Sequence, residues 1–267
     1  MGNEQQLTGG NASGRVVRVD DPTWGPTVRK PWLSHSALIE RFCSRLQAAG
    51  IDLPSSFGRD DQGRAVTEFV PGRIALDLPP LRPDELVRVG RMLRAIHDAS
   101  AATVPSSEIA DWPVGLIPPP GAADLICHND ATPWNLLIGD RWVFIDWDGA
   151  GPSTRAWDLA YSAQAFAGLG PEQSPDEGAT RLRALVLEGY GADEALAAEL
   201  PALLGVRALA MFELLERSHA AGSEPWGTMF TEGHGDHWGG VADHCSRHEQ
   251  VWRRALAGEP TVETTGV

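Results

Sequence analysis

The feature that most constrains the fold is a group of three short apolar runs near the middle of the 267-residue chain. They cover residues 125–127, 136–138 and 142–145, and a polar turn follows each of them. Such runs are too short for a buried helix, but they suit strands of a small, covered sheet. The sequence therefore predicts short buried strands joined by turns.

Candidate catalytic and metal-binding residues lie at the ends of these runs. His128, Asp130 and Asn135 follow the first run with the spacing H-x-D-x-x-x-x-N, and Asp146 ends the third. Two strands that flank a tight turn would bring Asp130, Asn135 and Asp146 to one edge. Phosphoryl transfer needs such a set, because one carboxylate orients the attacking hydroxyl while hard oxygen ligands hold Mg²⁺. Ordinary turn residues are the alternative for Asp130 and Asn135, since Asp and Asn favour turns.

The pattern changes at the Pro-Gly pair at residues 71–72. Before it, a loop is predicted over the first 14 residues, then strands at 15–19 and 27–30 and one helix between Ser34 and Gly50. A hairpin follows, with one strand around residue 57, a turn at 59–63 and a second strand at 64–70. After the pair and the three short runs, helices dominate. They are predicted from Pro83 onward and at 155–168, 177–189, 192–217 and 240–256, followed by a disordered tail. The chain thus predicts an α+β fold with a sheet-rich N-terminal lobe over 1–72, including a hinge at 68–72, and a larger, mainly helical C-terminal lobe over 73–267.

Net charge, apolar runs and cysteine content limit the classes of partner and the compartment that we expect. The formal net charge is −14 and no basic stripe is present, which argues against a nucleic-acid binder. No apolar run approaches the roughly 18 residues that a membrane-spanning helix needs, so no membrane is expected. The three cysteines are far apart in the sequence, which is typical of the reducing cytoplasm.

Lysine is almost absent from the sequence. Of 22 basic residues, 21 are Arg and one is Lys30. Because the two side chains differ in shape and reach, retention of one lysine indicates a need for an ammonium group in a phosphate or carboxylate pocket, with chance retention as the alternative.

The central motifs resemble those of a known family. HNDATPWN followed by FIDWDGAGPSTRAWDLA resembles the aminoglycoside phosphotransferase family and its choline-kinase-like relatives, which have a two-lobed protein-kinase-like fold. Asn129 replaces the Arg of the protein-kinase H-R-D motif, and residues 146–148 read D-W-D in place of D-F-G. Both departures are typical of small-molecule kinases.

The resemblance implies roles for the central residues. Asp130 would be the catalytic base, and Asn135 and Asp146 would be the Mg²⁺ ligands. His128 would brace the catalytic loop, and Asp158 would support it from the helix below.

On the nucleotide side, the resemblance implies that Lys30 contacts the α- and β-phosphates of ATP and that Glu40 pairs with it. The hinge, with Glu68 and Val70, would read adenine through its backbone.

Two features depart from the family pattern. A Gly-rich phosphate loop would read G-x-G-x-x-G, whereas the chain offers Gly9, Asn11 and Gly14. Arg29 stands beside Lys30, and because neighbouring side chains of a strand point to opposite faces, only one of them can face the cleft. Lys30 is preferred, with Arg29 as the alternative.

The sequence thus predicts an ATP- and Mg²⁺-dependent kinase acting on a hydroxyl group of a small molecule. An amino sugar, and so a cation, is the favoured acceptor; an amino alcohol or another sugar is the alternative. A nucleotide-binding pseudokinase that acts through partner contacts is a second hypothesis, and a metal-dependent hydrolase using His244 and His248 a third. Five residues are candidates for lining an acceptor pocket, with helix packing as the alternative: Glu213, Glu216, Trp226, Asp236 and Trp238.

Overall fold

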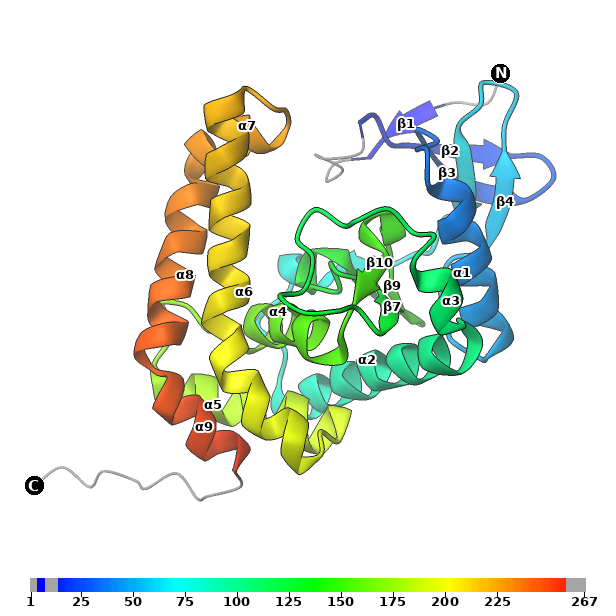
Figure 1. Cartoon of the computed structure of the whole chain (residues 1–267). Coiled ribbons are helices and arrows are strands. Elements are labelled where there is room, and N and C mark those ends of the chain that lie inside the picture. Colours follow the sequence, from blue (N-terminus) through cyan, green and yellow to red (C-terminus); the bar gives the residue numbers. More distant parts are fainter. Residues whose placement is uncertain (1–3, 8–13, 258–267) are drawn as a thin grey trace, which may run out of the picture.

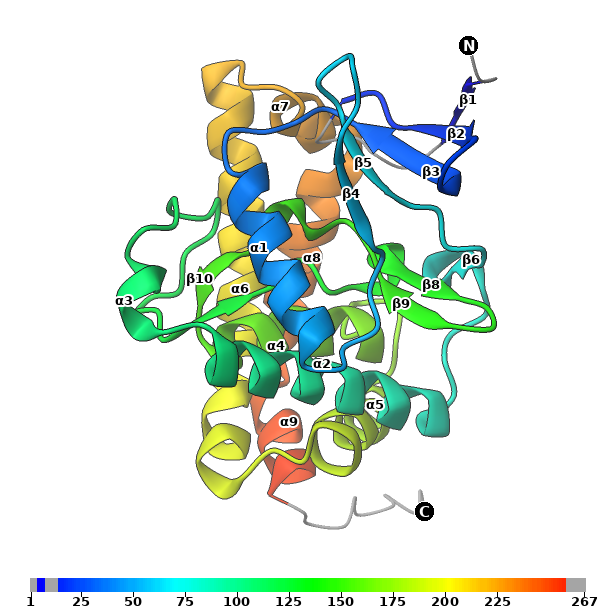
Figure 2. The same ribbon diagram turned by 90° about the vertical axis from the view of Figure 1, so that its right-hand side faces the viewer.

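The computed structural model describes residues 4–7 and 14–257, and its two ends are built from different elements (Figures 1 and 2). The N-terminal end is an antiparallel sheet in the order β1-β2-β3-β5-β4, accompanied by α1 (Ser36–Ala48). Its strands are β1 (Glu4–Gln6), β2 (Val17–Asp21), β3 (Gly25–Lys30), β4 (Ser56–Arg59) and β5 (Ala65–Glu68).

Helix α1 links the sheet to the rest of the molecule. Ile39, Phe42 and Leu46 recur with helical spacing, and all three are buried in the core. The edge of Phe42 meets Trp147 at a centroid distance of 6.0 Å. Gly50 has φ of +90°, which glycine adopts without strain just after a helix.

Two small sheets lie in the middle of the molecule. β7 (Leu125–Cys127) pairs with β10 (Gly151–Ser153), while β6 (Arg73–Ile74), β8 (Leu136–Ile138) and β9 (Trp142–Phe144) form an antiparallel set in that order. Each of these strands is two or three residues long, so the loops between them carry most of the polar groups.

Helices surround these strands, with α6 and α8 side by side at the left of Figure 1 and α4 between them and the small sheets. They are α2 (Pro83–Thr103), α3 (Ser106–Ile109), α4 (Arg155–Ala167), α5 (Pro175–Arg183), α6 (Glu194–Ala221), α7 (Trp226–Met229), α8 (Gly235–Arg247) and α9 (Glu249–Leu256). Short 3₁₀ or π turns complete the chain: η1 (Ala75–Asp77), η2 (Pro133–Asn135), η3 (Trp147–Gly149), η4 (Ala184–Tyr190) and η5 (Phe230–His234).

A glycine pair allows α2 and η4 to pack with their backbones in contact. A Cβ atom on Gly90 would lie 2.2 Å from the carbonyl oxygen of Leu185, and one on Gly189 would lie 2.6 Å from that of Val87. Any side chain at either position would force the two elements apart. This close packing brings Tyr190, at the end of η4, against the face of α2.

The α+β architecture predicted from the sequence is confirmed, and so are most elements. The strands at 125–127 and 136–138 and the helix that begins at Pro83 match the prediction. Helix α1 begins one residue after its N-cap His35, so Ser34 is not the cap. The boundary at residue 72 remains a prediction.

Three expectations were wrong. Residues 4–6, expected in a loop, form strand β1 by pairing with β2. The predicted helix at 240–256 is two helices with His248 between them, and the helix predicted at 177–189 changes from α5 into the π turn η4. Gly9, Asn11 and the predicted disordered tail lie outside the described residues.

Helix α6 corrects the expectation about apolar runs. By length and composition it is the one helix, within 4–7 and 14–257, that is apolar enough to cross a membrane. It packs against α4, α8 and α9 and carries the buried Arg207, as expected of a core helix. These contacts bury 39% of the most apolar window of the helix.

Candidate active site

The loop between β7 and β8 is held by a histidine at its base. His128 is buried, and its Nε2 donates to the carbonyl oxygen of Ile145 at 3.1 Å while its Nδ1 accepts from the backbone N–H of Asp130 at 3.3 Å. These two partners require a proton on Nε2 and none on Nδ1, and burial lowers the pKa of His128, which favours this neutral form. The side chain joins this loop to the residue before Asp146, as a bracing role requires.

Asp130 lies half-buried in this loop, within reach of two donors. Its Oδ2 accepts from Asn135 Nδ2 at 2.7 Å, and its Oδ1 accepts from Trp134 Nε1 at 3.2 Å. Burial, with the charge of Asp146, raises the pKa of Asp130 to about 7, against the lowering effect of the two hydrogen bonds. A carboxylate with this pKa exchanges a proton near neutral pH, which suits a general base.

Asn135 and Asp146 lie beside Asp130, as the sequence predicted. The backbone N–H of Ile145 donates to the carbonyl oxygen of Asn135 at 2.9 Å, and the Asn135 amide nitrogen donates to Asp130. Within the described part of the chain no donor meets the amide oxygen of Asn135. That oxygen and the partly exposed carboxylate of Asp146 are hard ligands of the kind that Mg²⁺ prefers.

The backbone at two loop positions is in the left-handed region. Asn129 has φ of +62° and Asp146 has φ of +58°, and they are the only such non-glycine residues in the described part of the chain. Asn and Asp tolerate this conformation better than other side chains. Both positions adjoin the predicted site, where backbone strain is often found.

Lys30 reaches this cluster from the N-terminal sheet. Its Nζ lies 3.0 Å from Asp146 Oδ1 and 2.7 Å from Asp148 Oδ1. Burial opposes the charge, but the two carboxylates outweigh it and raise the pKa of Lys30. Arg29 points the other way and pairs with Asp21 and Asp60. The alternation of β3 therefore brings the ammonium, and not the guanidinium, to the cluster.

The expected pairing of Glu40 with Lys30 is wrong for this structure. Glu40 Oε1 accepts from Ser56 Oγ on β4, and no ion pair joins it to Lys30 within the described residues. The turn η3 places Asp148 on the same side as Asp146, and His35 Nε2 donates to the Asp148 carbonyl oxygen at 3.1 Å. Two carboxylates of this turn therefore bind Lys30 in place of the helix residue.

The hinge residues are packed and tethered. Val70 is buried, and Glu68 accepts from the backbone N–H of Ser55 at 3.1 Å and pairs with Arg141 in the turn between β8 and β9. A Cβ on Gly139, in the same turn, would lie 2.8 Å from the Pro71 carbonyl oxygen, so glycine permits the close approach. The reading of adenine by the hinge backbone remains a prediction.

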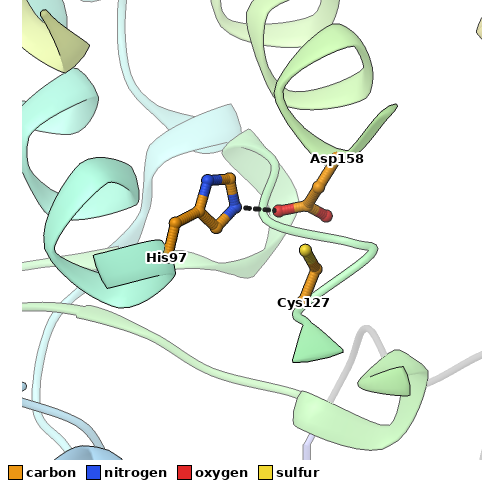
Figure 3. A group of neighbouring side chains, drawn as sticks. All are labelled: His97, Cys127 and Asp158. Atoms are coloured by element: carbon orange, nitrogen blue, oxygen red, sulfur yellow. Dashed lines mark hydrogen bonds and ion pairs between the residues drawn. The ribbon is translucent and has the colours of Figure 1, made fainter. Parts of the chain in front are cut away.

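Asp158 supports the loop from below, through a network shown in part in Figure 3. Its Oδ1 accepts from the backbone N–H of Asn129 at 2.7 Å, and its Oδ2 accepts from His97 Nε2 at 2.9 Å. His97 Nδ1 bonds the Tyr190 hydroxyl at 2.8 Å, to which Arg155 donates at 3.2 Å. Burial opposes ionisation, but these donors lower the pKa of Asp158 overall. The network ties α2, η4 and α4 to the loop.

Figure 3 also shows Cys127 beside His97 and Asp158, and their potential ligand atoms lie within 4.8 Å of one another. Each atom is already engaged, since the Cys127 thiol faces the Thr154 carbonyl oxygen at 3.8 Å. Burial holds the pKa of this thiol well above its usual range, which disfavours the thiolate that metals bind. We interpret the group as part of the supporting network.

A cluster of three aromatic side chains extends from Asp130, and of the three only Trp238 was assigned to the site from the sequence. Trp134 meets Tyr161 and Trp238 edge-on at 6.1 and 6.4 Å, and the last two stack at 5.5 Å. Of the acceptor-pocket candidates, Trp238 thus belongs to this cluster, whereas Glu213 bonds exposed Arg217. Trp134 was detectable, since it lies inside the H-x-D-x-x-x-x-N motif. Tyr161 carried no signal beyond its place in a helix.

The histidines near the C-terminus do not form a metal site of three or more ligands within 4–7 and 14–257. The ring centroids of His244 and His248 lie 4.7 Å apart, and both rings pack near Trp252. The Cys245 thiol points into the core toward the Leu169 carbonyl oxygen. Nothing in this geometry favours the hydrolase hypothesis.

Comparisons with known proteins agree with the geometry. Residues 109–200 match the model of the phosphotransferase enzyme family. The chain is 31% identical over 210 residues to a trifolitoxin immunity protein from Rhizobium leguminosarum bv. trifolii, covering 72% of this chain and 75% of that protein.

Solved structures share the fold. An ethanolamine kinase from Plasmodium vivax superposes with a TM-score of 0.62 at 12% identity, covering 95% of this chain and 84% of that one. An amicoumacin kinase in complex with AMP-PNP and Ca²⁺ superposes with a TM-score of 0.60 at 14% identity. The match covers 96% of this chain and 89% of that one.

Proposed function

We propose that this chain, which belongs to the phosphotransferase enzyme family, transfers the γ-phosphate of ATP to a hydroxyl group of a small molecule. The observation that carries the proposal is the convergence of Asp130, Asn135 and Asp146 opposite the single lysine of the chain, Lys30. Asp130 is the group that accepts the proton of the acceptor hydroxyl as that oxygen attacks phosphorus in line.

The geometry supports this role for Asp130 in two ways. Its two donors, Asn135 and Trp134, fix the direction of the carboxylate, and its pKa of about 7 lets it take up a proton at physiological pH. Holding the hydroxyl in place removes much of the entropy cost of a reaction between two molecules.

Asn135 and Asp146 fit a divalent cation, because each offers an oxygen that can turn toward a ligand. Bound Mg²⁺ supplies charge neutralisation at the phosphates of the nucleotide. Lys30 lies 3.0 Å from Asp146, so its ammonium is positioned to contact the same phosphates. The solved neighbour in complex with AMP-PNP and Ca²⁺ supports a nucleotide and a divalent cation as ligands of a protein with this fold.

The acceptor is a small molecule with a free hydroxyl group. The family resemblance favours an amino sugar, and the ethanolamine kinase of similar fold supports an amino alcohol as the alternative. We place the enzyme in the cytoplasm, because its three cysteines are unpaired and buried, and we expect neither a nucleic-acid nor a membrane partner.

The test compares wild type with Asp130→Asn in phosphate transfer from Mg-ATP to a panel of hydroxyl compounds. We expect Asp130→Asn to lower kcat by about 10²- to 10⁴-fold, the usual contribution of a general base, while Mg-ATP still raises the melting temperature. Asp140→Asn, an exposed change in the turn after β8, is the matched control and retains activity. Equal turnover by wild type and Asp130→Asn would contradict the proposed role of Asp130, and equal and negligible turnover across the whole panel would favour the pseudokinase.

A further inference from the structure

Arg207, in the middle of α6, is a buried positive charge that no carboxylate contacts in the part of the chain that the structure describes. Its side chain belongs to a residue that is only 4% exposed, and its Nη1 has no hydrogen-bond partner. Neither a hydrogen bond nor an ion pair joins its guanidinium to any residue that the structure describes. A buried charge left in this state destabilises the fold, so its presence needs a reason.

Among the described residues, two aromatic rings are the groups that contact the guanidinium closely. The Arg207 Cζ lies 3.9 Å from the ring centroid of Tyr161 and 5.5 Å from that of Trp157, both on α4. The ring faces attract the cation, but they leave the N–H groups at the edge of the guanidinium unpaired. Burial accordingly lowers the pKa of Arg207.

A second arginine, the partly buried Arg181, shows how this fold satisfies such a group when its role is packing. Arg181 donates to the carbonyl oxygens of Leu81, Phe166 and Ala167 at 2.7, 2.9 and 3.0 Å. All three of its nitrogens therefore have partners. Arg207 differs from Arg181 in this respect, and not in the chemistry of the side chain.

Arg207 lies next to the proposed site of phosphate transfer. The Tyr161 ring beneath it contacts Trp134, whose Nε1 donates to Asp130. The charge of Arg207 is close enough to lower the pKa of Asp130, against the effect of burial. The Tyr161 hydroxyl also has no hydrogen-bond partner among the described residues. Two unpaired donors thus lie on the side of Asp130 that is formed by α4 and α6.

We propose that Arg207 binds an anionic group of the acceptor, so that the hydroxyl facing Asp130 belongs to a molecule that also carries a carboxylate or a phosphate. This inference rests on the proposed function and names its substrate class. The planar fork of a guanidinium matches two oxygens of one carboxylate or phosphate, and a ring on its face leaves that fork available. An amine elsewhere on the same molecule is compatible with it.

The test uses pairs of acceptors that differ in the anionic group: L-serine with ethanolamine, gluconate with glucose, and glycerol 3-phosphate with glycerol. Wild type, Arg207→Met, Arg207→Lys and the control Arg181→Met are compared in transfer from Mg-ATP. We expect wild type to prefer the anionic member of at least one pair by about tenfold or more in kcat/KM, as expected for a buried charge pair. The carboxylate and phosphate pairs distinguish the two sources of the anion.

In Arg207→Met we expect this preference to disappear through a rise in KM, with partial recovery in Arg207→Lys. Arg181→Met keeps the preference. If wild type prefers the uncharged or amine member of every pair, or if Arg207→Met keeps the preference, the inference is overturned while the proposed function stands.

Melting of the unliganded protein tests the inference without turnover. Arg207→Met should melt at or above the temperature of wild type, because it removes an unpaired charge, whereas Arg181→Met should melt several degrees lower. Equal losses in the two variants would make Arg207 a packing residue and overturn the inference. If Mg-ATP does not raise the melting temperature and no acceptor is turned over, the proposed function fails. The melting temperatures of Arg207→Met and Arg181→Met still show in that case whether Arg207 is an unpaired charge or a packing residue.

Discussion

Two buried polar regions flank the loop that carries Asp130, and they differ in how completely they are paired. Below the loop, the supporting network of Asp158, His97 and Tyr190 bonds at each of its side-chain polar atoms. Beside the loop, neither the Arg207 guanidinium nor the Tyr161 hydroxyl has a hydrogen-bond partner among the described residues, and Arg207 Nη1 is fully buried. The difference indicates that the first region holds the loop, whereas the second keeps its hydrogen-bonding capacity for a ligand.

The two regions differ in the free-energy cost of their buried polar groups. A buried polar group without a partner costs about 1–3 kcal/mol, and a charge costs more. The supporting network avoids this cost by using Arg155 and a backbone N–H as its outer partners. In the region around Arg207, by contrast, the unpaired groups destabilise the unliganded protein. Substitutions in the first region should therefore lower stability, and substitutions in the second should change binding.

The largest effect is expected for Asp158→Asn. Removing one partner of a buried, hydrogen-bonded pair typically lowers the free energy of unfolding by about 3 kcal/mol. Denaturant unfolding measures this loss, with Asp98→Asn, in a more exposed pair, as a control that should lose less than about 1 kcal/mol. Because folding lowers the pKa of Asp158, the advantage of wild type is present at neutral pH and is lost as pH falls below about 4. A stable Asp158→Asn protein would remove the contrast between the two regions.

Lys30→Met should separate catalysis from stability. The ammonium is paired with Asp146 and Asp148, yet we expect the change to lower kcat/KM for Mg-ATP by about 100-fold, the scale of one lost charge contact in the transition state. Arg29→Met is the matched control, because it removes a cation of the same strand that faces Asp21 and Asp60. It should lower the melting temperature and leave kcat/KM within a few-fold. The reverse pattern would make Arg29 the phosphate-binding cation.

The same substitution at two tyrosines compares the regions directly. Tyr190→Phe removes a hydroxyl bonded to His97 and Arg155, and it should lower the free energy of unfolding by about 1 kcal/mol. Tyr161→Phe removes a hydroxyl that has no partner in the described part of the chain, and it should leave unliganded stability within about 0.5 kcal/mol. Thermal and denaturant unfolding measure both. A larger loss in Tyr161→Phe than in Tyr190→Phe would reverse our interpretation.

The smallest effect is expected for Glu40→Gln. Glu40 bonds Ser56 and not Lys30, so the change should alter kcat/KM for Mg-ATP less than about threefold and stability by about 0.5 kcal/mol. Steady-state kinetics with varied ATP provides the measurement, and Asp148→Asn serves as the comparison with a larger effect. A 100-fold loss in Glu40→Gln would restore the pairing that the sequence predicted.

The sequence predicted the parts of the site that are local in the chain. His128, Asp130, Asn135 and Asp146 lie within one segment, so spacing and residue type were sufficient to group them. Lys30 was identified in another way, because it is the single lysine among 22 basic residues.

Contacts between distant segments could not be predicted. The pairing of Lys30 with Asp148 in place of Glu40 depends on how α1 lies against the turn η3, which no periodicity encodes. Likewise, Arg207 was not singled out from the sequence. The packing of α6 against α4 shows that Arg207 lies beside Tyr161 with no ion pair among the described residues.

The pH dependence of phosphate transfer tests the central claim, that Asp130 is the base of this site, most directly. Its pKa is raised to about 7, and the ionised form is active, so kcat/KM of wild type should be constant above pH 8 and fall about tenfold per pH unit below about 7. The residual activity of Asp130→Asn should show no such fall between pH 5 and 9. A wild-type profile that is flat across this range, or the same fall in both proteins, would contradict the account.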